Sequence, residues 1–169
     1  MKTVGILALQ GDFEAHRRAV EAAGGQAVEV RTAAALEHVG GLIIPGGEST
    51  TMLKLIREEG LFEPLLRFGR GRPVFGTCAG AILLAARVTH PEQESFGLMD
   101  IEVERNGYGR QLNSRVVRLP LENGLRERAG GEDGLEAVFI RAPIIRGTGA
   151  GVRVLARYLG APVLVEQGQ

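Results

Sequence analysis

The sequence VFGTCAGAILL, residues 74–84, joins an expected buried strand, Val74-Phe75, to an apolar helical stretch through a glycine-framed turn. The turn, Gly76-Thr77-Cys78-Ala79-Gly80, has the G-x-nucleophile-x-G form of a nucleophile elbow, with cysteine in place of serine. Small neighbours suit a tight turn that strains the central residue, and the helix behind it favours the reactive thiolate. We therefore predict Cys78 as a nucleophile and the Ala79 N–H as an oxyanion donor. A buried cysteine that only fills space is the alternative.

Around this segment, short apolar runs alternate with helical patterns. We expect strands at 3–9, 27–30, 41–44 and 73–76, and helices at 13–23, 33–38 (capped by Thr32), 51–58, 61–68 and 80–87. Strand–helix–strand order predicts a mostly parallel sheet with helices on both faces. Later strand candidates at 101–104, 114–119, 137–140, 153–157 and 162–165 predict antiparallel additions to the sheet or a small satellite layer.

A second glycine-rich segment, Pro45-Gly46-Gly47-Glu48-Ser49-Thr50, follows the third apolar run. Consecutive glycines let backbone amides approach a ligand closely, and Ser49 or Thr50 is the expected helix cap. The sequence contains neither G-x-x-x-x-G-K-[ST] nor G-x-G-x-x-G, so nucleotide binding is poorly supported. Because open parallel sheets carry their chemistry at the carboxyl ends of the strands, the segments that matter are Gln10-Gly11, Pro45–Thr50 and Thr77–Gly80.

The composition excludes several classes of protein. The 169 residues include 20 Lys+Arg and 20 Asp+Glu, and this neutral, interspersed charge argues against a nucleic-acid partner. A single cysteine rules out an internal disulfide and a cysteine-rich zinc site, and we expect no metal or cofactor. The apolar run at 3–9 is too short for a membrane span and is not a signal peptide. These features predict one soluble, cytoplasmic domain without a membrane partner.

The histidines give the predicted nucleophile no obvious base. His16 falls in the first expected helix, His38 ends a short helix, and His90 lies in a loop. None follows a late strand, so we expect a surface or structural role for all three. Arg141 ends the expected buried strand at 137–140, where it either neutralises a carboxylate or faces the site.

Taken together, these segments resemble class I glutamine amidotransferases, most closely the glutaminase subunits of pyridoxal 5′-phosphate synthases. The matching segments are GILALQG at 5–11, LIIPGGESTTM at 42–52, FGTCAG at 75–80, ERN at 104–106 with GRQ at 109–111, and FIRAP at 139–143. PGGEST and ERN…GRQ are much more specific than the elbow. The resemblance implies a flavodoxin-like, three-layer α/β/α sandwich forming a single amidotransferase domain over residues 1–169.

The resemblance also implies a reaction, in which Cys78 attacks the side-chain amide of L-glutamine, releases ammonia and leaves a thioester that water cleaves. The residues implied to line the glutamine site are Gly46, Gly47, Glu48, Ser49, Arg105, Ile140 and Arg141. Gly47 or a neighbouring amide would complete the oxyanion hole with Ala79. Glu48 suits the substrate ammonium, and Arg105 or Arg141 suits its carboxylate.

The family further implies a partner, a barrel-shaped synthase subunit that takes the ammonia, away from solvent, and builds pyridoxal 5′-phosphate, the vitamin B6 cofactor, from sugar phosphates. The glutaminase is expected to be weak until docked. The alternatives are a glutaminase for another amidotransferase and a catalytically silent glutamine-binding or regulatory subunit.

One family feature has no counterpart in the sequence. The family completes a Cys-His-Glu triad with a C-terminal His-Pro-Glu segment after a Gln-Gly motif, whereas this sequence ends at Gln167-Gly168-Gln169. Neither role is carried over, and His90 and Glu92 are not reassigned to the triad. We expect a longer protein that adds the final strand and helix, because an open edge strand and an uncovered sheet face make a poor end to a domain.

Overall fold

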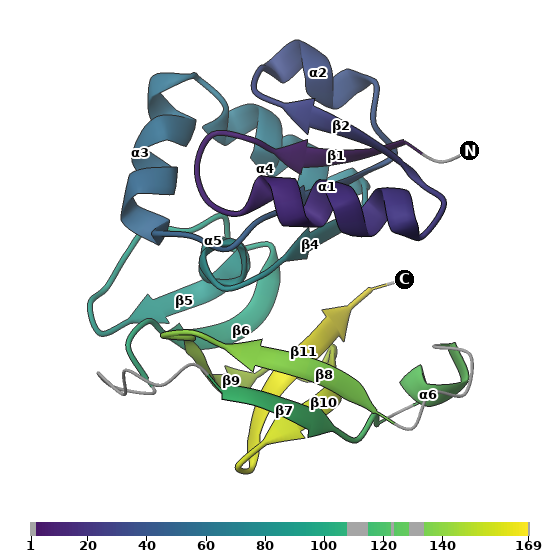
Figure 1. Ribbon diagram of the computed structural model, residues 1–169. Helices are drawn as coiled ribbons and strands as arrows, with labels where there is room; N and C mark the ends of the chain where they lie inside the picture. Colours follow the sequence, from purple (N-terminus) through teal and green to yellow (C-terminus); the bar gives the residue numbers. More distant parts are fainter. Residues whose placement is uncertain (1–2, 108–114, 123, 129–133, 169) are drawn as a thin grey trace. The chain divides into compact units, whose positions relative to one another are not determined.

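The computed structural model describes residues 3–107, 115–122, 124–128 and 134–168. The chain divides into two compact units, and each is described by itself (Figure 1). The first unit comprises Met1–Leu84 with Glu94–Leu98, and the second comprises Ala85–Gln93 with Met99–Gln169.

A four-stranded parallel sheet organises the first unit, with the strands in the order β2-β1-β3-β4. The strands are β1 (Thr3–Leu7), β2 (Gln26–Val30), β3 (Gly41–Ile44) and β4 (Val74–Gly76). Burial of Gly5, Ile6 and Leu7 explains the unbroken apolar run of β1, since strands covered on both faces do not alternate. The predicted parallel sheet is confirmed. The predicted burial of Phe75 is wrong, because β4 is an edge strand of this sheet and leaves Phe75 47% exposed.

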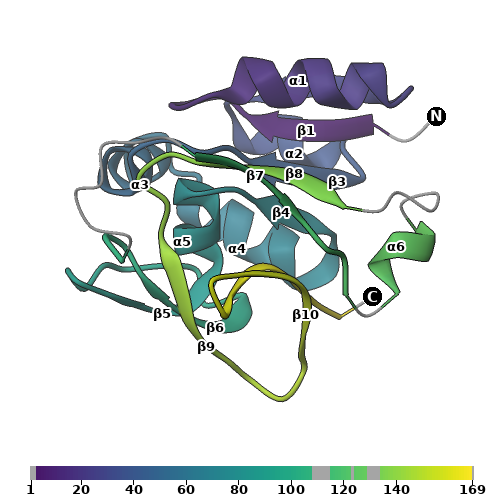
Figure 2. The ribbon, with the colours of Figure 1, turned by 60° about the horizontal axis from the view of Figure 1, so that its bottom comes forward.

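Helices cover both faces of this sheet. Figures 1 and 2 show α1 (Phe13–Ala22) on one face and α2 (Ala33–Glu37) and α4 (Phe62–Gly71) on the other. The remaining helices of the unit are α3 (Ser49–Glu58) and α5 (Ala79–Leu84). The largest fully buried side chains in this part of the unit include Met52 and Ile56 of α3, Leu61 directly before α4, Leu65 of α4 and Leu83 of α5.

Three predicted helix boundaries are wrong, and one of them is the end of the helix expected at 61–68, which continues to Gly71. The helix expected at 51–58 begins at Ser49, and its cap is Glu48 and neither Ser49 nor Thr50, because the longer carboxylate reaches two free N–H groups of the first turn. The helix expected at 80–87 ends at Leu84, because pairing with a partner strand draws residues 85–89 into a sheet. The predicted cap Thr32 is confirmed, and its side chain accepts a hydrogen bond from the Ala35 N–H.

The second unit is built of short, mainly antiparallel strands, as the sequence predicts. One sheet has the order β5-β6-β9, formed by β5 (Ala85–Thr89), β6 (Met99–Glu104) and β9 (Ile144–Thr148). Two antiparallel pairs join β7 (Arg115–Leu119) to β8 (Leu135–Phe139) and β10 (Val152–Tyr158) to β11 (Ala161–Gln167). A single turn of helix, α6 (Leu125–Arg128), lies between β7 and β8. The sequence missed β5, which runs on from an apolar helix, and β9, which contains Gly147.

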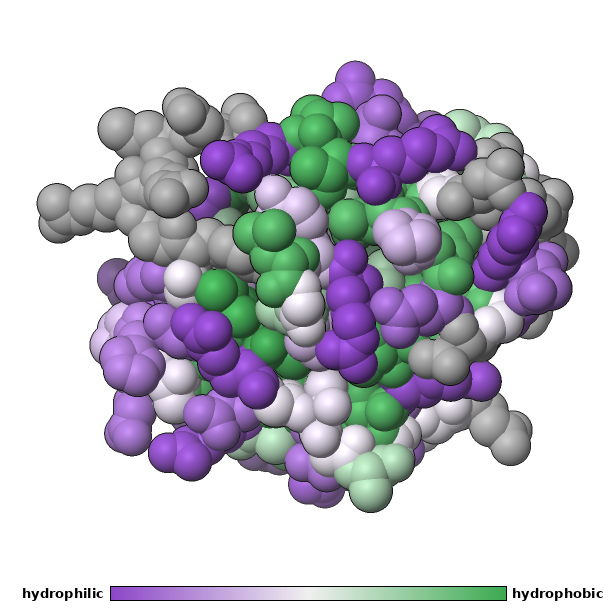
Figure 3. Space-filling view, turned by 90° about the horizontal axis from the view of Figure 1, so that it is seen from below, coloured by the Kyte–Doolittle hydropathy of each residue, from purple (hydrophilic) through white to green (hydrophobic). Residues whose placement is uncertain are grey.

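The strand predicted to be buried before Arg141 is largely exposed. Val138 is 57% and Ile140 61% exposed, because β8 pairs with one neighbour, β7, among the strands described. In Figure 3, hydrophobic residues (green) lie between hydrophilic ones (purple) across the face in view. Within the described residues, no helix has both the length and the apolar character needed to cross a membrane.

Candidate active site

Cys78 occupies the turn between β4 and α5, where its φ of +47° lies in the left-handed region. This confirms the strained strand-to-helix turn that the glycine frame predicts. Such a backbone costs about 1–3 kcal/mol and persists only where the surroundings hold it. The Thr77 N–H donates to the Ile44 carbonyl at 3.1 Å, the Gly80 N–H to the Thr77 carbonyl at 2.8 Å, and the Ile82 N–H to the Cys78 carbonyl at 3.1 Å. Cys78 is a free cysteine and is only partly buried.

The Gly46-Gly47 loop runs directly beside this turn. A Cβ added to Gly46 would lie 3.3 Å from the Cys78 Cβ, closer than most side chains tolerate. A Cβ on Gly80 would lie 2.1 Å from the Ile44 carbonyl oxygen, so the start of α5 packs against the end of β3. The small residues therefore allow two backbones to meet at Cys78.

The loop after β1 contacts the Gly46-Gly47 loop and Glu48, which follows it. The Gln10 Oε1 accepts a hydrogen bond from the Glu48 N–H at 3.1 Å, and the Asp12 N–H donates to the Gly46 carbonyl at 3.1 Å. Gly11 has φ +90°, and a Cβ there would lie 2.0 Å from the Gly46 oxygen, so only glycine fits. Three loops at the carboxyl ends of β1, β3 and β4 thus meet, as expected for an open parallel sheet.

Glu48 holds the first turn of α3. Its carboxylate accepts hydrogen bonds from the Thr50 N–H at 3.1 Å, the Thr51 N–H at 2.7 Å and the Thr51 hydroxyl at 2.7 Å, and also from the Thr50 hydroxyl. Hydrogen bonds from Thr50 and then Thr51 lower the pKa of Glu48 to about 2, against the opposing effect of desolvation. The side chain is therefore anionic at neutral pH. Its contact with glutamine stays a prediction, as does that of Ser49, which is buried.

His16 lies next to the elbow, although the sequence assigned it only a surface or structural role. Its Nε2 shares a hydrogen bond of 3.0 Å with the Thr77 hydroxyl, and its ring meets Phe75 edge-on at 6.5 Å between centroids. Burial lowers the pKa of His16, while the Asp12 carboxylate acts in the opposite direction. At neutral pH the ring is uncharged.

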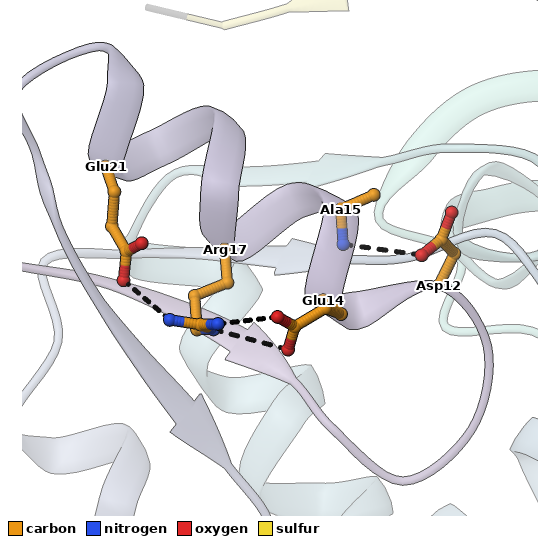
Figure 4. A network of polar contacts seen from close by, with 5 residues as sticks. All are labelled: Asp12, Glu14, Ala15, Arg17 and Glu21. Carbon is orange, nitrogen blue, oxygen red and sulfur yellow. Dashed lines mark hydrogen bonds and ion pairs between the residues drawn. The ribbon is translucent and has the colours of Figure 1, made fainter.

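The helix that carries His16 is anchored at its start. The Asp12 carboxylate accepts a hydrogen bond from the Ala15 N–H at 3.3 Å, and Arg17 pairs with Glu14 and Glu21 (Figure 4). The two ion pairs are exposed and stabilise the helix only weakly.

The remaining histidines have other surroundings. His38 is exposed at the end of α2, and the His90 carbonyl accepts a hydrogen bond from the Asn106 side chain at 3.2 Å. Among the residues that the structure describes, no three His, Cys, Asp or Glu side chains gather in a way that could hold a metal ion.

The other residues expected at the glutamine site belong to the second unit. Arg105 follows β6, and its N–H donates to the Thr89 carbonyl at 3.0 Å. Ile140 is exposed, and Arg141 has φ +44°. The Gly109-Arg110-Gln111 segment lies outside the described residues. A glutamine-binding role for Arg105, Ile140 and Arg141 stays a prediction.

Comparison with known proteins settles the family. The model of the SNO glutamine amidotransferase family matches residues 6–169. The chain belongs to this family. Its resemblance to glutamine amidotransferases and its α/β fold are therefore confirmed.

Relatives of this amidotransferase carry a more specific name. A protein of Solibacter usitatus named pyridoxal 5′-phosphate synthase subunit PdxT is 62% identical over 170 residues, covering 100% of this chain and 88% of the relative. A protein of Pelotomaculum thermopropionicum with the same name is 50% identical over 167 residues, covering 98% and 82%.

Solved structures agree on the fold. A crystal structure described as a glutamine amidotransferase has a TM-score of 0.85 and 46% identity, covering 98% of this amidotransferase and 85% of that chain. PurLQS from Thermotoga maritima has a TM-score of 0.64 at 19% identity, covering 94% and 74%, and supports the fold alone.

Sequence reasoning singled out Gln10-Gly11 by its position but gave Gln10 no role, and it missed the contact between His16 and Thr77. Gln10 could be noticed because it directly follows a buried strand. His16 and Thr77 are 61 residues apart and share no motif, so only the folded chain brings them together.

Proposed function

We propose that this amidotransferase is the glutaminase subunit of a pyridoxal 5′-phosphate synthase and hydrolyses L-glutamine to L-glutamate and ammonia. The observation that carries the proposal is the Cys78 turn, which has a positive φ and lies against the Gly46-Gly47 loop. The names of the PdxT relatives support the choice of synthase.

In the proposed reaction, the Cys78 thiolate attacks the side-chain amide carbon of glutamine. The carbonyl oxygen of the tetrahedral intermediate becomes negative and accepts hydrogen bonds from the backbone N–H groups of Gly47, or a neighbour, and Ala79. Loss of one such donor typically costs about 3 kcal/mol of transition-state stabilisation. Collapse of the intermediate breaks the C–N bond, and the nitrogen takes up a proton and leaves as ammonia. Water then cleaves the glutamyl thioester and restores Cys78.

Recognition of glutamine rests on charge in this proposal. Glu48, anionic at neutral pH, faces the α-ammonium, and Arg105 or Arg141 pairs with the α-carboxylate. The lining is completed by Gly46, Gly47, Ser49 and Ile140. The attack also requires a base for the thiol proton, and we assign that role to none of His16, His38 and His90.

The ammonia has a defined destination in this proposal. It passes to a barrel-shaped synthase subunit, which consumes it in building pyridoxal 5′-phosphate, so the two subunits form a hetero-oligomer.

The test is glutamine hydrolysis by the full-length protein in the presence of its synthase subunit, followed as release of glutamate and ammonia. Cys78→Ala is expected to reduce hydrolysis to background, whereas His38→Ala, which alters the exposed residue directly after α2, is expected to leave it unchanged. Hydrolysis that persists in Cys78→Ala would show that another group is the nucleophile. Glutamine binding without hydrolysis by the unaltered protein would instead support a silent glutamine-binding subunit.

A further inference from the structure

We propose that His16 is a positioning residue for the nucleophile and that its hydrogen bond to Thr77 holds the Cys78 turn in the geometry used for attack. The expected effect of His16 on glutamine turnover rests on the proposed glutaminase function. Its effect on the thiol of Cys78 is measurable without glutamine.

The first argument is the place of Thr77 in the chain. Thr77 directly precedes Cys78, and its backbone is bonded to Ile44 at the end of β3 and to Gly80 in α5. The His16 contact adds a side-chain link to α1, an element 61 residues away in the sequence. Hydrogen bonds to β3, α5 and α1 therefore all hold Thr77. Since Thr77 directly precedes Cys78, they also fix the position of the Cys78 backbone.

The second argument is that the imidazole is itself held in place. Its ring packs edge-on against Phe75 with an interplanar angle of 81°, and the contact with Thr77 is partly buried. Phe75 and Thr77 both belong to the segment that leads into Cys78. A partly desolvated hydrogen bond is electrostatically stronger than one fully exposed to water.

The third argument is the strain at Cys78. A non-glycine residue at φ +47° relaxes unless its neighbours prevent it. Relaxation moves the sulfur relative to the Gly46-Gly47 loop, and displacements of about 1 Å can cost about 100-fold in rate. A tether on the preceding residue opposes this relaxation while leaving glutamine binding untouched.

The kinetic test compares His16→Ala, Thr77→Val and the double variant with the unaltered protein, each as the full-length chain with its synthase subunit. We expect kcat to fall about tenfold in each single variant, the upper end for one hydrogen bond, with KM for glutamine nearly unchanged. Because both substitutions break the same contact, the double variant is expected to lose no more than either single variant. His16→Gln, whose amide reaches the position of Nε2, should recover part of the rate, and His38→Ala is the matched control.

A chemical test reads the thiol directly. Cys78 is the single cysteine of the sequence, so its alkylation by iodoacetamide reports one site. We expect the rate of Cys78 alkylation at pH 7 to fall at least about threefold in His16→Ala and in Thr77→Val. Each variant loses the hydrogen bond between His16 and Thr77 that holds the Cys78 turn, worth about one net hydrogen bond. The rate is expected to stay unchanged in His38→Ala. If His16→Ala does not fold, Thr77→Val and His16→Gln give the same comparison.

The outcomes separate this inference from the proposed function. Unchanged kcat and alkylation rates, with only a lowered melting temperature, would reduce the contact to a structural role and overturn the inference. If the unaltered protein does not hydrolyse glutamine but alkylation still slows in the variants, the proposed function fails and the positioning role stands.

Discussion

Cys78, the residue proposed as the nucleophile, has a strained backbone at a strand-to-helix turn. The strain is held by contacts that need small neighbours. Gly80 cannot carry a Cβ because Ile44 lies too close, and Gly46 leaves room beside the sulfur-bearing side chain. The glycine frame of the elbow is therefore a requirement of packing, and this is why the turn can be recognised from sequence.

Arg105 yields a prediction at the same scale. If its guanidinium pairs with the glutamine carboxylate, Arg105→Ala loses a charge-assisted contact worth about 1.5–3 kcal/mol and raises the KM for glutamine about 10- to 100-fold, with a smaller effect on kcat. Steady-state kinetics with the synthase subunit measures this. Arg87→Ala is the matched control, because Arg87 lies on β5 of the same unit and pairs loosely with Glu102 at 3.7 Å. An unchanged KM in Arg105→Ala would remove Arg105 from the glutamine site.

At the scale of elements, loops and helix starts do most of the positioning. The β1–α1 loop bonds to Gly46 and Glu48, and Glu48 in turn caps α3. The Gly46-Gly47 loop is thus held from both ends. Local sequence rules place a cap in this segment, yet they favour Ser49 or Thr50, since short polar side chains are the usual caps.

The Glu48 cap has a pH-dependent consequence for stability. The folded-state pKa of about 2 lies below the ordinary value of 4.5, so the carboxylate stabilises the fold fully above about pH 4.5. That contribution is lost as the pH falls through about 2. We expect Glu48→Ala to lower the free energy of unfolding by about 1 kcal/mol at pH 7, a typical value for a cap. Solvent exposure keeps the effect modest.

Urea unfolding of both proteins between pH 7 and pH 2 measures the difference. The difference in free energy of unfolding between the unaltered protein and Glu48→Ala should decrease only below pH 4.5. Glu59→Gln, at the opposite end of α3, is the control for a general effect of removing a carboxylate. A gap of constant size down to pH 2 would contradict capping by the ionised side chain.

At the scale of the whole molecule, the residues predicted for the glutamine site belong to two different units. The elbow, the Gly46-Gly47 loop, Gln10 and His16 belong to the first unit. The second unit contains Arg105, Ile140 and Arg141, the residues with which the proposal completes glutamine recognition. Cys78 and the contacts that hold its turn thus form within one unit, around one parallel sheet.

A prediction for the whole molecule concerns its proposed partner, the synthase subunit. If this amidotransferase works as proposed, adding the barrel synthase subunit raises kcat/KM for glutamine by about tenfold or more, equivalent to about 1.4 kcal/mol of transition-state free energy. Glutamate release by the protein alone and by the complex measures the ratio. The complex formed with Cys78→Ala reports any hydrolysis by the partner itself. Equal rates with and without the partner would contradict activation by docking.

The residue pattern alone is sufficient for the parallel sheet, the elbow at Cys78 and the glycine loop at Gly46-Gly47. These features depend on local rules, namely apolar periodicity, tight turns and close backbone approach, which leave a signature within a few neighbouring residues. Other features depend on contacts between distant segments. They include the pairing of β5 with β6, the hydrogen bond from the Glu48 N–H to the Gln10 side chain and the hydrogen bond between His16 and Thr77. Such contacts form only when folding brings together residues that are far apart in the sequence, and so only the tertiary structure decides them.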